Sequence, residues 1–156
     1  MLGRLFKKAV APRPLDTARV PDGVRVYAIG DIHGRDDLLS ALLAKIQTDD
    51  QARGPADTQI IFLGDLVDRG PGSAAVIETA MALKASGKNV RFLMGNHEEV
   101  FVSACRKGDP KVTRFFLRIG GEETVLSYPI TRAEYMTLDM EQLTERLATL
   151  GHILIN

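Results

Sequence analysis

Three short apolar runs lie in the first part of the chain, and each ends at a glycine followed by a polar residue. They are VRVYAI (Val24–Ile29), QIIFL (Gln59–Leu63) and NVRFLM (Asn89–Met94). Continuous apolarity, without alternation of apolar and polar residues, is typical of strands that are covered on both faces. The pattern therefore predicts three buried strands.

Helical periodicity fills the spaces between these runs. Apolar residues recur at helical spacing over residues 38–46 and again over 75–83, and Gly87 follows the second segment where a C-terminal cap is expected. Strand and helix therefore alternate twice before the third strand. This order predicts a βαβαβ unit, which is an α/β fold with a parallel sheet.

Beyond the third run the strand signal fades. Three further segments, 100–107, 112–121 and 140–150, have apolar residues at helical spacing. Because glycine is unfavourable inside a helix, Gly151 is expected to end the last of them. The run HILI (His152–Ile155) then predicts the start of a fourth strand.

The N-terminal segment differs from the rest of the chain. Residues 1–22 carry several basic side chains and three prolines, which interrupt regular structure. We predict that this segment is a flexible leader and that 23–156 form the folded domain; a short helix on a membrane surface is the alternative.

The composition narrows the class of protein. The chain has 156 residues, enough for one domain, and its 20 basic and 20 acidic residues give no net charge. A balanced charge disfavours a protein that coats nucleic acid or anionic membrane, so neither partner is expected. The single cysteine, Cys105, excludes an internal disulfide and fits a reducing compartment. No apolar run is long enough to span a bilayer or to form a signal-peptide core, so a cytoplasmic location is expected.

Candidate chemistry is concentrated in the loops that follow the three predicted strands. These loops are GDIHG (Gly30–Gly34), GDLVDRG (Gly64–Gly70) and GNHE (Gly95–Glu98). In open α/β sheets, ligands bind beyond the carboxyl ends of the strands. Asp31, Asp65 and Asn96 each follow a glycine at such an end. Together with the imidazole of His33, their oxygen atoms suit Mn²⁺, Fe or Zn²⁺.

Each motif alone also has an ordinary explanation. A Gly-Asp step is common turn chemistry, Asp68 and Arg69 could form an exposed ion pair of little energetic value, and His97 could simply begin a helix. It is improbable that three successive strands would each be followed by a Gly-Asp or Gly-Asn step by chance. The combination therefore favours a metal site.

The three motifs together resemble the calcineurin-like metallophosphoesterases. The sequence Asp-Arg-Gly at Asp68–Gly70 resembles the motif of the phosphoprotein-phosphatase branch, which includes bacterial serine/threonine phosphatases. The resemblance covers roughly Arg25 to Tyr128. It implies that the chain is the βαβαβ N-terminal half of a four-layer α/β/β/α sandwich.

The resemblance also implies an activity. The expected reaction is metal-dependent hydrolysis of phosphate monoesters, with phosphoserine and phosphothreonine of proteins as the main substrates and a metal-bound hydroxide as the nucleophile. One alternative is a hydrolase of dinucleoside polyphosphates or other small phosphoesters. Another is an inactive, truncated chain or a binding module.

Roles for individual residues follow from the same resemblance. Asp31 and His33 would hold one divalent metal, Asp65 would bridge it to a second, and Asn96 would bind that second metal. Mn²⁺ is favoured, with Fe and Zn²⁺ as alternatives.

The remaining roles concern the substrate. Arg69 would bind the phosphate oxygens, together with Asn96. His97 would be the general acid that protonates the leaving oxygen, and Asp68 would orient it. A histidine held by a carboxylate suits this task because its pKa lies near neutrality.

The chain also departs from the family pattern. The family uses two further histidines from a later part of its sequence, and only His152 remains here. The second metal therefore keeps only Asp65 and Asn96. Half a sandwich would expose an apolar sheet face, so self-association is expected there. Met94 stands where the phosphatase signature commonly has a basic residue.

Overall fold

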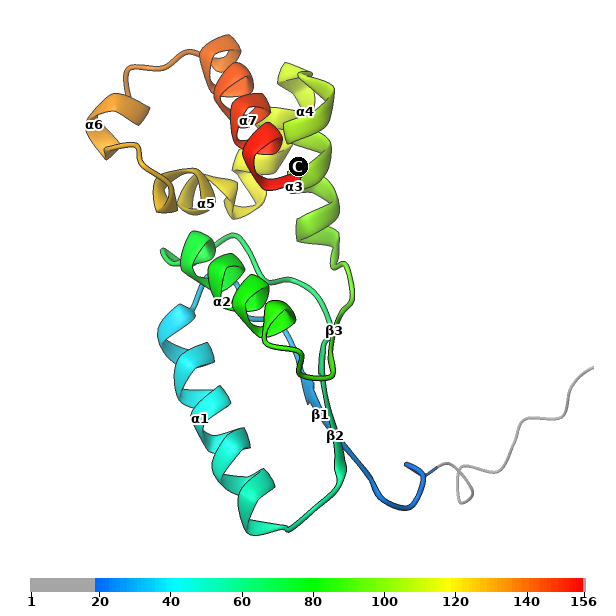
Figure 1. Ribbon diagram of the computed structural model, residues 1–156. Coiled ribbons are helices and arrows are strands. Elements are labelled where there is room, and N and C mark those ends of the chain that lie inside the picture. Colours follow the sequence, from blue (N-terminus) through cyan, green and yellow to red (C-terminus); the bar gives the residue numbers. More distant parts are fainter. Residues whose placement is uncertain (1–18, 156) are drawn as a thin grey trace, which may run out of the picture.

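Figure 1 shows the computed structural model of the chain. It describes residues 19–155, apart from the side chains of residues 107 and 151–155, so most of the predicted leader and the side chain of His152 lie outside the described part. Three strands form one parallel sheet in the order β1-β2-β3. Their bounds are Val24–Ile29 (β1), Asp57–Phe62 (β2) and Val90–Phe92 (β3). The predicted parallel α/β sheet is confirmed, with a third strand that is shorter than its apolar run.

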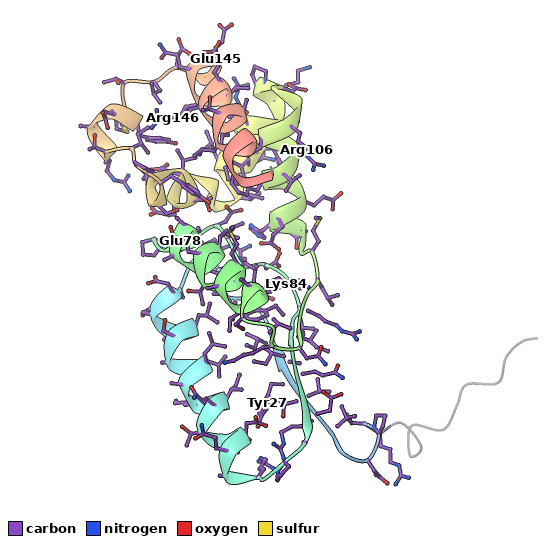
Figure 2. All side chains as sticks on the ribbon, in the orientation of Figure 1. Tyr27, Glu78, Lys84, Arg106, Glu145 and Arg146 are labelled. Atoms are coloured by element: carbon purple, nitrogen blue, oxygen red, sulfur yellow. The ribbon has the colours of Figure 1, made fainter. Side chains whose placement is uncertain are left out.

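Two helices cover the same face of this sheet. They are α1 (Asp36–Ala52) and α2 (Ser73–Ala85), and both lie to the left of the strands in Figure 1. Parallel strands need such crossovers, and the right-handed sense of both places the helices on one side. Tyr27 points from β1 toward α1, where its hydroxyl donates to Asp49 at 2.7 Å (Figure 2).

The opposite sheet face has no covering element among the residues that the structure describes. Leu63 and Leu93, which follow β2 and β3 directly, are 50% and 53% exposed. The expectation that the strands are covered on both faces is therefore met on one face only within residues 19–155. Self-association through the open face stays a prediction.

After β3 the chain forms a group of helices beyond the carboxyl edge of the sheet (Figure 1). They are α3 (Asn96–Lys107), α4 (Pro110–Phe116), α5 (Glu122–Ser127), α6 (Arg132–Tyr135) and α7 (Met140–Ile155). A kinked turn over Leu117–Gly121 joins α4 to α5, and Gly120 has a φ of 114° at the kink. None of the helices in residues 19–155 is long and apolar enough to cross a membrane.

Local sequence explains where several of these helices begin and end. The Asp109 side chain accepts a hydrogen bond from the Lys111 amide, and Pro110 occupies the first turn of α4, where no amide hydrogen is needed. Helix α3 ends before Gly108, which has a φ of 59° and so adopts the left-handed conformation that commonly ends a helix. Asp139 caps α7 through the Gln142 amide.

The predicted fourth strand is wrong, because α7 continues through Gly151 to Ile155. A single glycine costs a helix about 1 kcal/mol. Leu143, Leu147 and Leu150 are all buried on this helix, and burying one leucine side chain contributes about 1.5–3 kcal/mol. Packing therefore outweighs the local preference of glycine.

One hydrophobic core joins the sheet layer to the helical group. It runs without interruption from Ile29 and Phe62 of the sheet to Phe101, Phe116 and Leu147 of the helices. The rings of Phe101 and Phe116 stack with centroids 5.3 Å apart. The helical group is thus fixed against the carboxyl edge of the sheet, where the three loops lie.

Candidate metal centre and active site

Three predicted metal ligands lie together beyond β1 and β2. One ligand atom from each of Asp31, His33 and Asp65 lies within 4.8 Å of the other two. The two loops that carry them are joined by backbone bonds, since the amides of Ile32 and His33 both donate to the Asp65 carbonyl at 2.9 Å. The backbone therefore sets the spacing of the cluster.

The hydrogen bond at Nδ1 of His33 determines which ring nitrogen could be a metal ligand. Its Nδ1 lies 3.0 Å from the carbonyl oxygen of Val67. A carbonyl only accepts, so Nδ1 carries the proton and Nε2 is the acceptor nitrogen, which here lies 3.0 Å from a donor nitrogen of Arg69. Nε2 faces the cluster, 3.9 Å from Oδ2 of Asp31. An imidazole anchored through its other nitrogen, beside two carboxylates, is a donor set that fits Mn²⁺, Fe or Zn²⁺.

A buried carboxylate–imidazole pair lies next to this cluster. Nδ1 of His97 lies 2.7 Å from Oδ2 of Asp68, and the two residues are 2% and 0% exposed. Burial raises the pKa of the Asp68 carboxyl, and hydrogen bonds from Thr124 and His97 oppose that shift. With Nδ1 donating to the carboxylate, Nε2 of His97 is the atom that can exchange a proton with a substrate.

This burial excludes one of the ordinary explanations and bears on a second. Asp68 does not form an exposed ion pair with Arg69, because its carboxylate is buried against His97. His97 is the second residue of α3, yet its ring is enclosed and paired. Both side chains thus have the arrangement that a general acid and its orienting group require.

Arg69 connects the cluster of Asp31, His33 and Asp65 to the Asp68–His97 pair. Its two terminal nitrogens lie 3.0 Å from Nε2 of His33 and 2.9 Å from Nε2 of His97. The residue is exposed, so the guanidinium fork also faces solvent. A planar fork at this place suits the bidentate recognition of phosphate oxygens.

Asn96 is located beside the cluster without a described contact to it. It is the first residue of α3 and is exposed, and the amide of the next residue, His97, donates to Oδ1 of Asp65 at 3.1 Å. The third loop thus reaches the cluster of Asp31, His33 and Asp65 through its backbone. The roles of Asn96 toward metal and phosphate stay predictions.

Glu98 holds the second and third loops together, a role that the sequence did not reveal. Oε1 accepts the amides of Leu66 (2.7 Å) and Val67 (3.2 Å). Oε2 accepts those of Asp65 (2.7 Å) and Gly95 (2.9 Å). A glutamate three residues into a helix is a common capping signal, but its reach to a loop 32 residues earlier depends on the tertiary fold.

Thr124 is the second residue that sequence reasoning missed. It lies on α5, is fully buried, and its hydroxyl lies 2.6 Å from Oδ1 of Asp68. No motif or periodic pattern marks this position in the sequence, and 56 residues separate the partners.

Four residues of the site have a left-handed backbone. The φ angles are 45° at His33, 53° at Asp65, 71° at Asp68 and 68° at Arg69. Such angles cost energy for residues other than glycine, although aspartate and histidine adopt them more readily than most. The loops are therefore held in an unfavourable conformation by the contacts described above.

Comparison with known proteins identifies the family. The sequence profile described as calcineurin-like phosphoesterase matches residues 24–141. The chain belongs to this family. As a calcineurin-like phosphoesterase it has the predicted fold, an α/β unit consistent with the N-terminal half of the sandwich.

Individual relatives of this calcineurin-like phosphoesterase cover only part of it. The symmetrical bis(5'-nucleosyl)-tetraphosphatase of Acidovorax sp. is 44% identical over 80 residues, which are 51% of this chain and 26% of that protein. The protein of the same name from Klebsiella pneumoniae is 43% identical over 72 residues, 46% of this chain and 23% of that protein. The matched part is thus about a quarter of each relative's length.

A solved structure supports the fold alone. A hypothetical protein from Pyrococcus horikoshii OT3 superposes with a TM-score of 0.51 at 23% identity, covering 83% of this chain and 44% of that one. The shared architecture agrees with the sheet and helices described above.

Proposed function

We propose that this phosphoesterase hydrolyses the phosphoanhydride bridge of dinucleoside polyphosphates. The observation that carries the proposal is the identity of 44% and 43% to two enzymes named symmetrical bis(5'-nucleosyl)-tetraphosphatase. Hydrolysis at the central anhydride of a tetraphosphate bridge would give two nucleoside diphosphates. This is the alternative substrate class inferred from the sequence, and the named relatives favour it over phosphoproteins.

The residues of the site support a phosphoryl-transfer mechanism. Asp31, His33 and Asp65 would hold the divalent metal, with Asn96 as a further oxygen ligand. When bound, the metal would activate water and neutralise phosphate charge. These four residues lie at the carboxyl edge of the sheet, where ligands bind in such folds.

The chain's own polar groups would perform the remaining steps. Arg69 would bind the non-bridging phosphate oxygens and hold the phosphoryl group in line with the attacking water. Nε2 of His97 would donate a proton to the leaving oxygen, while Oδ2 of Asp68 keeps the ring oriented at 2.7 Å. No protein nucleophile is required.

A second candidate substrate is a phosphoserine or phosphothreonine monoester on a protein. The Asp68-Arg69-Gly70 step favours it, because that step resembles the phosphoprotein-phosphatase branch. The same Arg69 and His97 would act on either substrate, so the site geometry alone serves both.

The test compares both substrates on the purified chain with Mn²⁺. Release of nucleoside diphosphate from diadenosine tetraphosphate and release of phosphate from a phosphothreonine peptide are measured side by side. His97→Asn is expected to lower turnover about 10²- to 10⁴-fold. Arg69→Ala is expected to lower it too, and Arg106→Ala, an exposed arginine of α3 (Figure 2), serves as its matched control.

Each outcome decides between the candidates. Faster turnover of the dinucleotide, lost in His97→Asn and Arg69→Ala but kept in Arg106→Ala, supports the proposal. Faster turnover of the phosphopeptide supports the second candidate instead. No turnover of either, with Mn²⁺ binding shown by calorimetry, would mean that this chain is a binding module or an inactive part of an enzyme.

A further inference from the structure

Thr124, on helix α5 of the helical group, contacts the buried side of the Asp68–His97 pair. Asp68 uses Oδ2 for His97, and its other oxygen, Oδ1, accepts a hydrogen bond from Oγ1 of Thr124 at 2.6 Å. The Asp68 amide donates to the same hydroxyl at 2.8 Å. The Thr124 hydroxyl therefore contacts both the backbone and the carboxylate of Asp68.

The proton inventory fixes the direction of the two bonds between Thr124 and Asp68. The Thr124 hydroxyl has one proton and two lone pairs. It accepts from the Asp68 amide, so its proton goes to the Asp68 carboxylate at 2.6 Å. The hydroxyl of Ser73 lies 3.0 Å from that of Thr124 and also accepts from the Asp68 amide, at 3.1 Å. The carboxylate then receives one proton donor at each oxygen and cannot rotate without breaking a buried hydrogen bond.

The same helical segment holds the neighbouring residues of the loop. The carbonyl oxygen of Gly120 accepts the Arg69 amide at 2.9 Å. The Ser127 hydroxyl accepts the Ala74 amide at 3.0 Å. Hydrogen bonds from three residues of this segment, Gly120, Thr124 and Ser127, thus fix the loop from Asp68 to the start of α2.

We infer that Thr124 is a positioning residue of the active site. By holding the Asp68 carboxylate in one orientation, Thr124 fixes the direction in which Nε2 of His97 points. In this structure Nε2 faces a donor nitrogen of Arg69 at 2.9 Å, and as a general acid the protonated ring would donate from Nε2 to the leaving oxygen once Arg69 binds the phosphate. This inference rests on the proposed role of His97 as general acid. Thr124 itself does not touch substrate in this arrangement, because it lies behind Asp68 and is fully buried.

Three variants separate positioning from simple packing. Thr124→Val keeps the shape of the side chain and removes the hydroxyl, whereas Thr124→Ser keeps the hydroxyl. Thr144→Val is the matched control, because Thr144 is also buried in the helical group and its hydroxyl lies 3.0 Å from that of Thr113, away from the loops. Thr124→Val and Thr144→Val make the same exchange of a buried hydroxyl for a methyl group.

The first readout is the dependence of turnover on the leaving group. An activated ester such as p-nitrophenyl phosphate needs little protonation of its leaving oxygen, whereas an alkyl phosphate needs much. Thr124→Val is expected to lower kcat for the alkyl ester on the order of 10- to 100-fold, with a smaller loss for the activated ester and little change in KM. Thr124→Ser is expected to restore most of the loss, and Thr144→Val to show none. Equal losses for both esters would overturn the inference.

The second readout needs no catalysis. An imidazole Nδ1 proton bound to a buried carboxylate gives a slowly exchanging, downfield NMR signal, which His97→Asn would assign. In Thr124→Val this signal is expected to shift and to exchange faster with water, while Thr124→Ser and Thr144→Val leave it in place. An unchanged signal in Thr124→Val would overturn the inference. A changed signal in a chain that hydrolyses no phosphoester would refute the proposed function and leave the positioning contact supported.

Discussion

Replacing Glu98 by glutamine tests whether one carboxylate ties the second and third loops together. Glutamine has the same size but offers one acceptor oxygen instead of two. The Glu98 carboxylate accepts four backbone amides, two at each oxygen. In Glu98→Gln, two of these amides would face an NH₂ group that cannot accept.

The expected magnitude follows from the lost bonds. A hydrogen bond to a charged group contributes about 1.5–3 kcal/mol, so losing two costs about 3–6 kcal/mol. Glu98 is only partly buried, and water can reach some of the freed amides, which favours the lower end. We therefore expect unfolding free energy to fall by about 3 kcal/mol, a large share of the 5–15 kcal/mol typical of a domain.

Urea unfolding followed by far-UV circular dichroism measures this loss. Glu99→Gln is the matched control, because it removes the same charge one residue later in the first turn of α3 from an exposed side chain. It shares the loss of helix-dipole stabilisation, about 0.3–1 kcal/mol, but no loop amide depends on it. If the two variants agreed within about 0.5 kcal/mol, the role given to Glu98 would be refuted.

Three further predictions concern other parts of the molecule. Burial raises the pKa of the Cys105 thiol to about 11, so alkylation at pH 8 should be slower in the folded than in the urea-unfolded chain; equal rates would contradict this. A Cβ at Gly120 would lie 2.7 Å from Cγ of Arg69, so Gly120→Ala should destabilise the fold more in urea titrations than Gly87→Ala, which has an open surrounding and shares only the backbone strain. Mn²⁺ should raise the calorimetric melting temperature of the chain, and His33→Ala should abolish that rise; a persisting rise would place the metal elsewhere.

The position of the candidate metal site could be predicted from the sequence, because the carboxyl ends of neighbouring parallel strands lie at the same edge of the sheet. Asp31 and Asp65 each follow a glycine at the end of a strand, and adjacency of β1 and β2 was enough to bring them together. The Asp68–His97 pair was inferred through the family resemblance and lies within hydrogen-bond distance in the structure.

The supporting contacts were beyond sequence reasoning for a physical reason. Glu98 and Thr124 act through hydrogen bonds to a loop 32 and 56 residues away, respectively. Such bonds depend on where the helical group packs, and that packing is decided by a core distributed over many residues. The prediction that the helix ends at Gly151 was wrong for the same reason. The buried side of α7 stabilises the helix more than the local preference of glycine disfavours it.

The left-handed backbone at the site limits how its chemistry can be redesigned. His33, Asp65 and Asp68 belong to residue types that both bind metals or protons and tolerate a positive φ. Exchanging His33 or Asp65 for cysteine or glutamate, to favour another metal, would add conformational strain, because these residue types adopt a positive φ less readily. Glycine or asparagine would fit the backbone but offer a weaker ligand or none. A change of metal preference is therefore more accessible at Asp31, whose φ is not positive, than at His33 or Asp65, the other two residues of the proposed metal site that lie in these turns.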